Sequence, residues 1–336
     1  MSEIYLIFTE RSFGIDLAAQ RKERLYIYLY FSARYIKLLT VMNDVLYYGI
    51  AIAAGVLAGA LITYLFGKFP DKWLQDYGVT PEDPDYRPSK RMRPFPEGLI
   101  ACAFCAGCYC VTVYFCRIHY IYVFKPMHLA VILLAIPVLM LVMMADKLNR
   151  IIPDQFSIFI AGCGVLSVLA DIFEGSVWFS PDAKWWIPVL NKVIASVVGG
   201  GVIWLIGFLS ITFLGKEGMG MGDMRLLFAT GLITGCYGLI VLIYVSIFTA
   251  LLFAVPLLIR KMKRISKEKK RIAEAEDPRA EKLKIQREKA AIHFAEDPDY
   301  MAFGPFLALG CAVFMIMEPF FFEKMFETIV LFGVYF

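Results

Sequence analysis

Long stretches without a charged side chain decide what this chain can fold into. Residues 127–145, 193–214 and 226–259 contain no Asp, Glu, Lys or Arg, and a helix needs about 20 apolar residues to cross the hydrocarbon core of a bilayer. A soluble helix of that length would carry charges along its exposed face. Inside a bilayer, every backbone polar group must be hydrogen-bonded within its own segment. The sequence therefore predicts an all-α, polytopic membrane protein.

The composition agrees with this class. Of the 336 residues, 59% are hydrophobic and 19% are charged, whereas a soluble domain is about 25% charged. The net charge of +4 gives no support for a nucleic-acid partner, and membrane lipid is the expected surrounding. About eight spans are expected, at residues 45–66, 98–116, 127–145, 155–171, 193–214, 226–240, 241–259 and 301–317.

The stretch 226–259 is divided into two spans because of its length. As one helix it would measure about 51 Å at 1.5 Å per residue, against a hydrocarbon core of about 30 Å. The sequence Thr-Gly-Cys-Tyr-Gly at 234–238 is suited to a turn. We therefore expect the chain to reverse there.

Basic residues gather in alternate loops and predict the orientation. Residues 260–289 alone hold thirteen Lys and Arg against six Asp and Glu. The positive-inside rule places such loops in the cytoplasm. The other basic loops or junctions are 68–93, 147–150 and 216–225. We expect a multi-pass protein of the cytoplasmic (inner) membrane.

The expected domain organisation follows from these spans. Residues 1–41 are an N-terminal extension that contains no good span. We expect natural translation to begin at Met42, which N-terminal sequencing would test, with an additional interfacial helix as the alternative. The remaining parts are a membrane domain at 42–259 with a cytoplasmic loop at 68–96, a charged cytoplasmic linker at 260–300, and the last span with its tail at 301–336. The linker is expected to be either a solvated helix or disordered.

The eight cysteines do not predict a metal site. All of them lie in apolar stretches, and four fall within residues 102–110. Zinc is commonly held by thiolates from polar loops, and thiolates within lipid would need strong compensation. Buried thiols behave as small hydrophobic groups, so we expect these cysteines to pack between helices.

Two aspartates stand out because of their positions. Asp146 follows directly after the uncharged stretch 127–145, and Asp223 ends the sequence Gly-Met-Gly-Met-Gly-Asp at 218–223. The expected topology puts both at the same depth, on the cytoplasmic side. Ionisable groups at such boundaries are costly and frequently functional, and alternating glycines let the backbone approach a neighbouring group closely.

Two carboxyl groups a few ångströms apart cannot both ionise easily, so one holds a proton while the other takes a proton from water. This predicts a protease-like pair at Asp146 and Asp223. The alternatives are that each aspartate caps a helix and that the glycines form a flexible turn. A dinucleotide-binding loop is not expected, because no strand precedes the glycines.

Four segments resemble the type IV prepilin peptidases, a family of membrane aspartic proteases with a GxGD motif. Residues 220–223 read Gly-Met-Gly-Asp, and residues 146–154 resemble the family's other signature, an aspartate followed by Ile-Pro-Asp. Residues 301–310 are similar to a PFGPFLALG segment that opens the family's last span. Residues 49–73 resemble its first span and the loop that follows. The segments occur in the family's order over residues 45–317.

This resemblance implies roles for individual residues. It implies catalysis by Asp146 and Asp223. The motif positions that support them are Gly220, Gly222, Pro153 and Asp154. Among these, Asp154 is interpreted as the cap of a helix beginning near Gln155. The implied substrate is a prepilin or pseudopilin, from which a short basic leader is cut at the cytoplasmic face of the membrane.

The resemblance has implications for cofactors as well. Proteolysis by such a pair requires none. Many relatives carry two CxxC pairs in the first cytoplasmic loop and also methylate the new amino terminus with S-adenosylmethionine. Residues 68–96 contain no cysteine, so no zinc site is expected there, and S-adenosylmethionine is a cofactor only if methylation is retained.

Rival functions remain open at this point. A transporter or channel could bind a cation or a proton at the two aspartates. A related GxGD protease could cut within a membrane helix or process another class of leader. A scaffold homologue could keep the fold without the chemistry.

Overall fold

The computed structural model describes residues 44–75, 82, 86, 88–119, 125–179, 183–214, 220–275, 277–290 and 301–331. The predicted N-terminal extension 1–41 lies outside these residues, as do linker residues 291–300. The chain divides into two compact units, Met1–Ala51 and Ile52–Phe336. Only residues 44–51 of the first unit are described, and the account below concerns the second.

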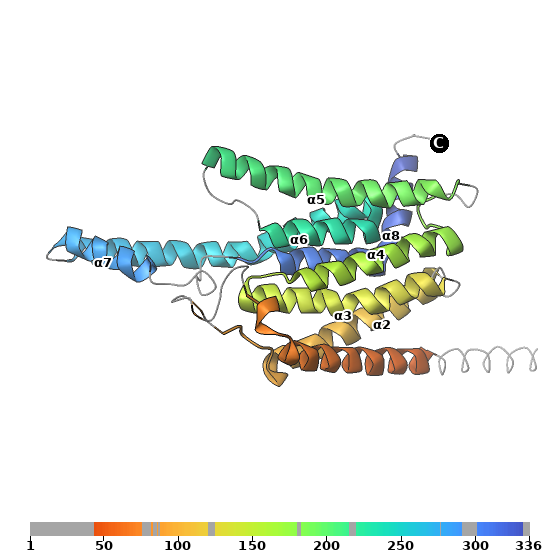
Figure 1. The fold of residues 1–336 in the computed structure, drawn as a ribbon, viewed down its shortest axis with the longest axis horizontal. Coiled ribbons are helices and arrows are strands. Elements are labelled where there is room, and N and C mark those ends of the chain that lie inside the picture. The colour runs from red at the N-terminus through yellow and green to blue at the C-terminus, as the bar shows by residue number, and fades with distance from the viewer. Residues whose placement is uncertain are drawn as a thin grey trace, which may run out of the picture. The chain divides into compact units, whose positions relative to one another are not determined.

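All secondary-structure elements among the described residues are helices, which confirms the predicted class. A helix at Asp44–Lys68 is followed by a short turn, η1, at Asp71–Trp73. The later elements are η2 (Pro94–Gly98), α2 (Leu99–His119), α3 (Pro126–Asn149), α4 (Asp154–Glu174), α5 (Trp186–Leu214), α6 (Met221–Ala273), α7 (Pro278–Ala290) and α8 (Gly304–Leu331). Among the described residues, seven helices are long and apolar enough to cross a membrane. Figure 1 shows α3, α4, α5 and the first part of α6 lying roughly alongside one another.

Helix α6 contains the predicted reversal. It has 53 residues, but Gly235 has the non-helical angles φ 66° and ψ −179°. Before this break, the backbone of Ala195 and Ser196 on α5 lies directly beside Gly231; after it, Gly238 lies beside Phe314 of α8. Ser246, further along α6, donates a hydrogen bond to the carbonyl of Phe306, near the start of α8, so the chain turns back after Gly235. The two halves of α6 therefore provide two of the predicted spans.

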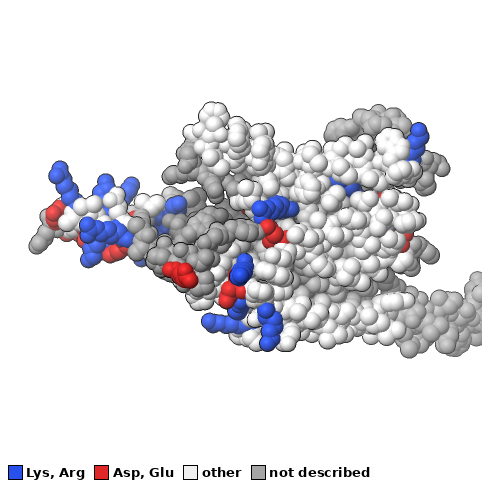
Figure 2. Space-filling view, in the orientation of Figure 1, with Lys and Arg blue, Asp and Glu red and all other residues white. Residues whose placement is uncertain are grey.

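The bundle is organised around the two halves of α6. α6 packs against α4, α5 and α8, and α3 packs against α4 and α8. Its second half continues beyond the other helices and carries α7 (Figure 1). Charged side chains in Figure 2 gather on this extension and at the ends of the bundle, and the band between them is largely uncharged. This band matches the hydrocarbon part of a bilayer.

The first helix meets α2 through small residues. A Cβ on Gly55 would lie 2.4 Å from the Cα of Ala106, and one on Gly59 would lie 2.4 Å from the Cα of Cys102. The two backbones are thus in direct contact, as is typical of membrane helices with small residues four apart. Cys102 is used here as a small packing residue.

Candidate active site

Asp146 lies in the last turn of α3. The residue is 6% exposed, and its carboxylate lies directly against Gly304 at the start of α8. The helix ends at Asn149 and is capped by Arg150, whose left-handed φ of 59° turns the chain and whose N–H donates to the Asp146 carbonyl at 2.9 Å. The carboxylate is therefore held between the end of one helix and the beginning of another.

Asp223 lies in the first turn of α6. Gly220 precedes the helix, and its carbonyl accepts a hydrogen bond from the N–H of Asp223 at 3.1 Å. The side chain of Asp223 is half-buried, and its carboxylate interacts electrostatically with that of Asp146. Two carboxylates from α3 and α6 thus lie at the same end of the bundle, which we call the site end.

Packing at the site end is close around two glycines, Gly222 and Gly304. A Cβ on Gly222 would lie 3.0 Å from the Cβ of Ile152, and one on Gly304 would lie 2.7 Å from the Cδ1 of the same isoleucine. The Gly304 Cβ would also lie 2.6 Å from the Oδ2 of Asp146. Ile152 is therefore the common packing partner of both glycines. Sequence reasoning did not identify its contacts, because they join segments far apart in the chain.

Pro153 and Asp154 begin α4. Pro153 is buried and precedes the helix, and it makes no side-chain capping hydrogen bond. Asp154 is the first helical residue and forms an ion pair with Arg225 of α6. The interpretation of Asp154 as the helix cap therefore differs from the structure, because its carboxylate is turned to Arg225. Gln155 is already inside the helix.

The segment before η2 is fastened to the site end. The Asn149 side chain accepts a hydrogen bond from the Lys90 N–H at 2.7 Å and donates one to the Lys90 carbonyl at 3.1 Å. Ser89 and Arg91 both bind the Asp71 carboxylate at 2.5 Å. The Ser89 hydrogen bond and the Arg91 charge hold the pKa of Asp71 below its usual value, against the opposing effect of burial. Asp71 therefore stays ionised at neutral pH and keeps its bonds to Ser89 and Arg91.

A buried polar cluster lies at the other end of the bundle, the far end. His128 bonds Asp171 and Glu174 at 3.0 Å each, and Lys192 bonds Asp171 at 2.7 Å. Lys192 also donates to the hydroxyl of Ser167 at 2.6 Å. Sequence reasoning did not identify this cluster. The available signal was that Lys192 and Asp171 interrupt or border apolar stretches.

The geometry of the site end limits the chemistry that it can perform. Two interacting carboxylates can share one proton, and such a pair can activate a water molecule for attack on a carbonyl. Among the described residues, no group of three or more His, Cys, Asp and Glu side chains is arranged to bind a metal ion.

Comparison with known proteins gives one family. Residues 133–255 match the type IV leader peptidase family, and this range contains both Asp146 and Asp223. A prepilin leader peptidase/N-methyltransferase of Xanthomonas campestris pv. campestris is 26% identical over 101 residues, which are 30% of this chain and 31% of that protein. The alignment thus spans about a third of the relative's length. No solved structure matches the chain.

Proposed function

We propose that the protein is a membrane aspartic endopeptidase, because residues 133–255 match the type IV leader peptidase family. Its proposed substrates are prepilins or pseudopilins, from which it removes a short leader. The observation that supports this most is the placement of Asp146 and Asp223 at the same end of the bundle, close enough for their charges to interact. The two residues come from two helices within the matched range. The same region gives no comparable support to a transporter or channel.

The proposed mechanism uses the pair as one unit. One carboxyl group holds the shared proton and polarises the scissile carbonyl, while the other removes a proton from the attacking water. Gly304, which lies against the Asp146 carboxylate, keeps this group in position during the step. All reacting groups are side chains and water, so we propose that leader removal proceeds without a cofactor. Methylation would be a separate reaction, detectable as a mass increase of the new amino terminus when S-adenosylmethionine is added.

The proposed orientation puts the site end at the cytoplasmic face of the inner membrane. Basic residues near this end and on the α6 extension favour that orientation. A substrate anchored by a hydrophobic helix, with its leader in the cytoplasm, would present its scissile bond at the depth of the two aspartates.

The first test is cleavage of a prepilin by the detergent-purified protein. Cleavage is measured as the shift of the prepilin band on a gel when the leader is removed. Asp146→Asn and Asp223→Asn keep the side-chain size but cannot share a proton. We expect each change alone to lower the cleavage rate by roughly 100- to 10,000-fold. Asp277→Asn is the control, because this aspartate lies at the start of α7, remote from the site end.

The outcomes of this test separate the candidate functions. Loss of cleavage in both variants, with the control unaffected, supports the aspartic mechanism. Cleavage that survives both changes excludes it. A wild-type protein that leaves the prepilin intact would point instead to transport or to a scaffold, and ion flux in vesicles would then decide between those two.

A second prediction concerns recognition of the leader. Acidic residues in the first loop, Glu82, Asp83 and Asp85, are proposed to attract its basic residues; the last two lie outside the described residues. Reversing these charges should raise KM about two- to fivefold with kcat unchanged, as is typical of exposed charge pairs. The difference should shrink at high salt. A KM that does not change would reject this role.

A further inference from the structure

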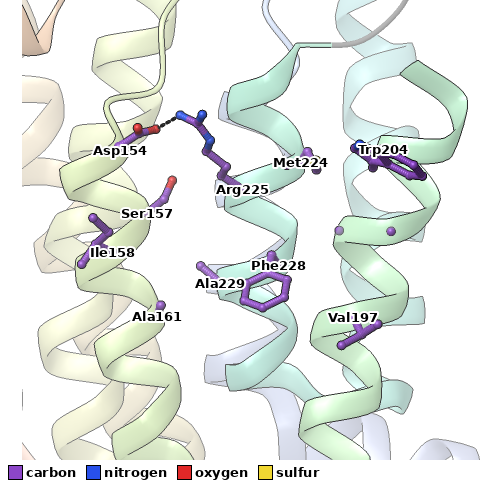
Figure 3. Close-up of a pocket in the computed structure, with 12 residues that line it drawn as sticks. Asp154, Ser157, Ile158, Ala161, Val197, Trp204, Met224, Arg225, Phe228 and Ala229 are labelled. Atoms are coloured by element: carbon purple, nitrogen blue, oxygen red, sulfur yellow. Dashed lines mark hydrogen bonds and ion pairs between the residues drawn. The ribbon is translucent and has the colours of Figure 1, made fainter. Parts of the chain in front are cut away.

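A groove separate from the two aspartates opens between α4, α5 and α6 (Figure 3). Its volume is about 790 Å³. The two catalytic candidates do not line it, and its walls near α6 are formed by residues such as Met224, Phe228 and Ala229. Helix α5 contributes Val197 and Trp204. The groove therefore lies against the site helix without being part of the site.

The body of the groove is apolar and faces outward. Ile158 is 69% exposed and Trp204 is 54% exposed, and both line it. Along α4 the lining runs from residue 154 to residue 161, which is about 10 Å at the helical rise. Exposed apolar surface of this kind on a membrane helix contacts hydrocarbon chains.

The end of the groove nearest the site end is polar. The Asp154–Arg225 ion pair lies there, and Ser157 is one turn further along α4 (Figure 3). The ion pair is only partly covered, with the Arg225 side chain 38% exposed and that of Asp154 29% exposed. One end of the groove thus offers a cation, an anion and a hydroxyl group side by side.

The buried hydroxyl group of Ser157 also indicates that the groove holds a ligand. The residue is 6% exposed, and its hydroxyl oxygen has no hydrogen-bond partner among the residues that the structure describes. Buried polar groups are normally hydrogen-bonded. Because this hydroxyl lines the groove, a ligand with an acceptor atom there would satisfy it.

We propose that the groove binds a phospholipid with an ethanolamine headgroup. Its phosphate accepts hydrogen bonds from Arg225 and from the Ser157 hydroxyl, and its ammonium group donates to Asp154. One acyl chain occupies the apolar body. This arrangement matches each charge of the headgroup with its opposite. A choline headgroup has no N–H to donate, and a glycerol headgroup would leave Asp154 facing an anionic lipid without a cation between them.

The test is native mass spectrometry of the delipidated protein titrated with phosphatidylethanolamine, phosphatidylglycerol and phosphatidylcholine of identical acyl chains. We expect phosphatidylethanolamine to bind roughly tenfold more tightly than either of the others, the effect of one charged hydrogen bond. Equal affinity for the three headgroups, or preference for another one, would overturn the proposal. Measuring this ranking requires no variant and no peptidase activity. The lipid proposal can therefore fail while the proposed peptidase function holds, and the reverse.

Two variants locate the effect. Asp154→Asn should reverse the preference toward phosphatidylglycerol, because Arg225 remains without its acidic neighbour. Ser157→Ala should weaken all phospholipids to a similar degree. The control Asp71→Asn removes the acid of another partly exposed Asp–Arg pair that lies outside the groove, and it should leave the ranking unchanged. A ranking that survives Asp154→Asn would place the lipid elsewhere.

Discussion

Gly304 is the residue outside the aspartate pair whose replacement should affect the site most directly. A methyl group there would approach Asp146 Oδ2 and Ile152 Cδ1 at less than 3 Å, so either α8 or the carboxylate must shift. We expect Gly304→Ala to lower kcat/KM for leader removal by about 100-fold, the cost of misplacing a catalytic group by about 1 Å. The measurement is cleavage kinetics alongside thermal unfolding in detergent.

Gly107→Ala is the matched control, because a Cβ at that helical glycine meets no atom within 4 Å. It should leave cleavage unchanged. If Gly304→Ala cleaves as fast as the wild type, close packing at this position does not hold Asp146 in place. If it merely unfolds at a lower temperature with normal kcat, Gly304 has a packing role only.

The residues of the site differ in how far the sequence could predict them. Asp146 and Asp223 could be singled out because each is an ionisable group at the border of an uncharged stretch. The contacts of Ile152 and the hydrogen bonds from Asn149 to Lys90 could not, since they join segments that only the fold brings together. Asp154 was predicted at the correct helix end, but its pairing with Arg225 depends on how α4 and α6 pack.

The reversal within α6 should depend on the glycine at its turning point. Gly235 combines a positive φ with an extended ψ, a region open essentially to glycine alone, and a Cβ would lie 2.4 Å from Asn191 Nδ2. Gly235→Ala should destabilise the protein by about 1–3 kcal/mol, measured as a lower free energy of unfolding. Gly207→Ala is the control, because that helical glycine has open space around it. Equal stability of the two variants would contradict a strained reversal.

The elements could be predicted from the sequence to different degrees. The break near 234–238 could be predicted because a single apolar helix of that length would not fit a bilayer. The non-helical angles of Gly235 confirm it. Helix α5 begins at Trp186 and not at the expected 193, because Lys192 is buried against Asp171 and does not mark the membrane border. The described part of the linker is helical up to Ala273 and again from Pro278, as expected of a segment rich in Lys, Glu and Arg. Of its two predicted states, the helix is the one found there.

The polar cluster at the far end joins three helices of the bundle, α3, α4 and α5, through buried hydrogen bonds and ion pairs. His128 on α3, Asp171 on α4 and Lys192 on α5 meet there. We expect Lys192→Met to destabilise the protein by about 3–5 kcal/mol, because it leaves the Asp171 carboxylate buried without its cation. Thermal unfolding should show the loss, while the protein that remains folded should cleave normally.

Lys184→Met is the control, because Lys184 is exposed and its loss should change stability little. An unfolding temperature equal to that of the wild type for Lys192→Met would show that the cluster is not a structural tie. Normal stability with lost cleavage would instead link the far end to catalysis.

The reversal at Gly235 has a consequence for how the protein enters the membrane. Residues 226–259 contain no charged side chain, so the two halves of α6 can pass into the bilayer as one hairpin, and no charge has to be carried across the hydrocarbon. Insertion of Asp, Lys or Arg at mid-membrane costs about 2.5–3.5 kcal/mol per residue, and this hairpin avoids that cost altogether. The strongly basic segment that follows then stays on the side from which the hairpin entered, so that the helix carrying Asp223 is oriented as it is made.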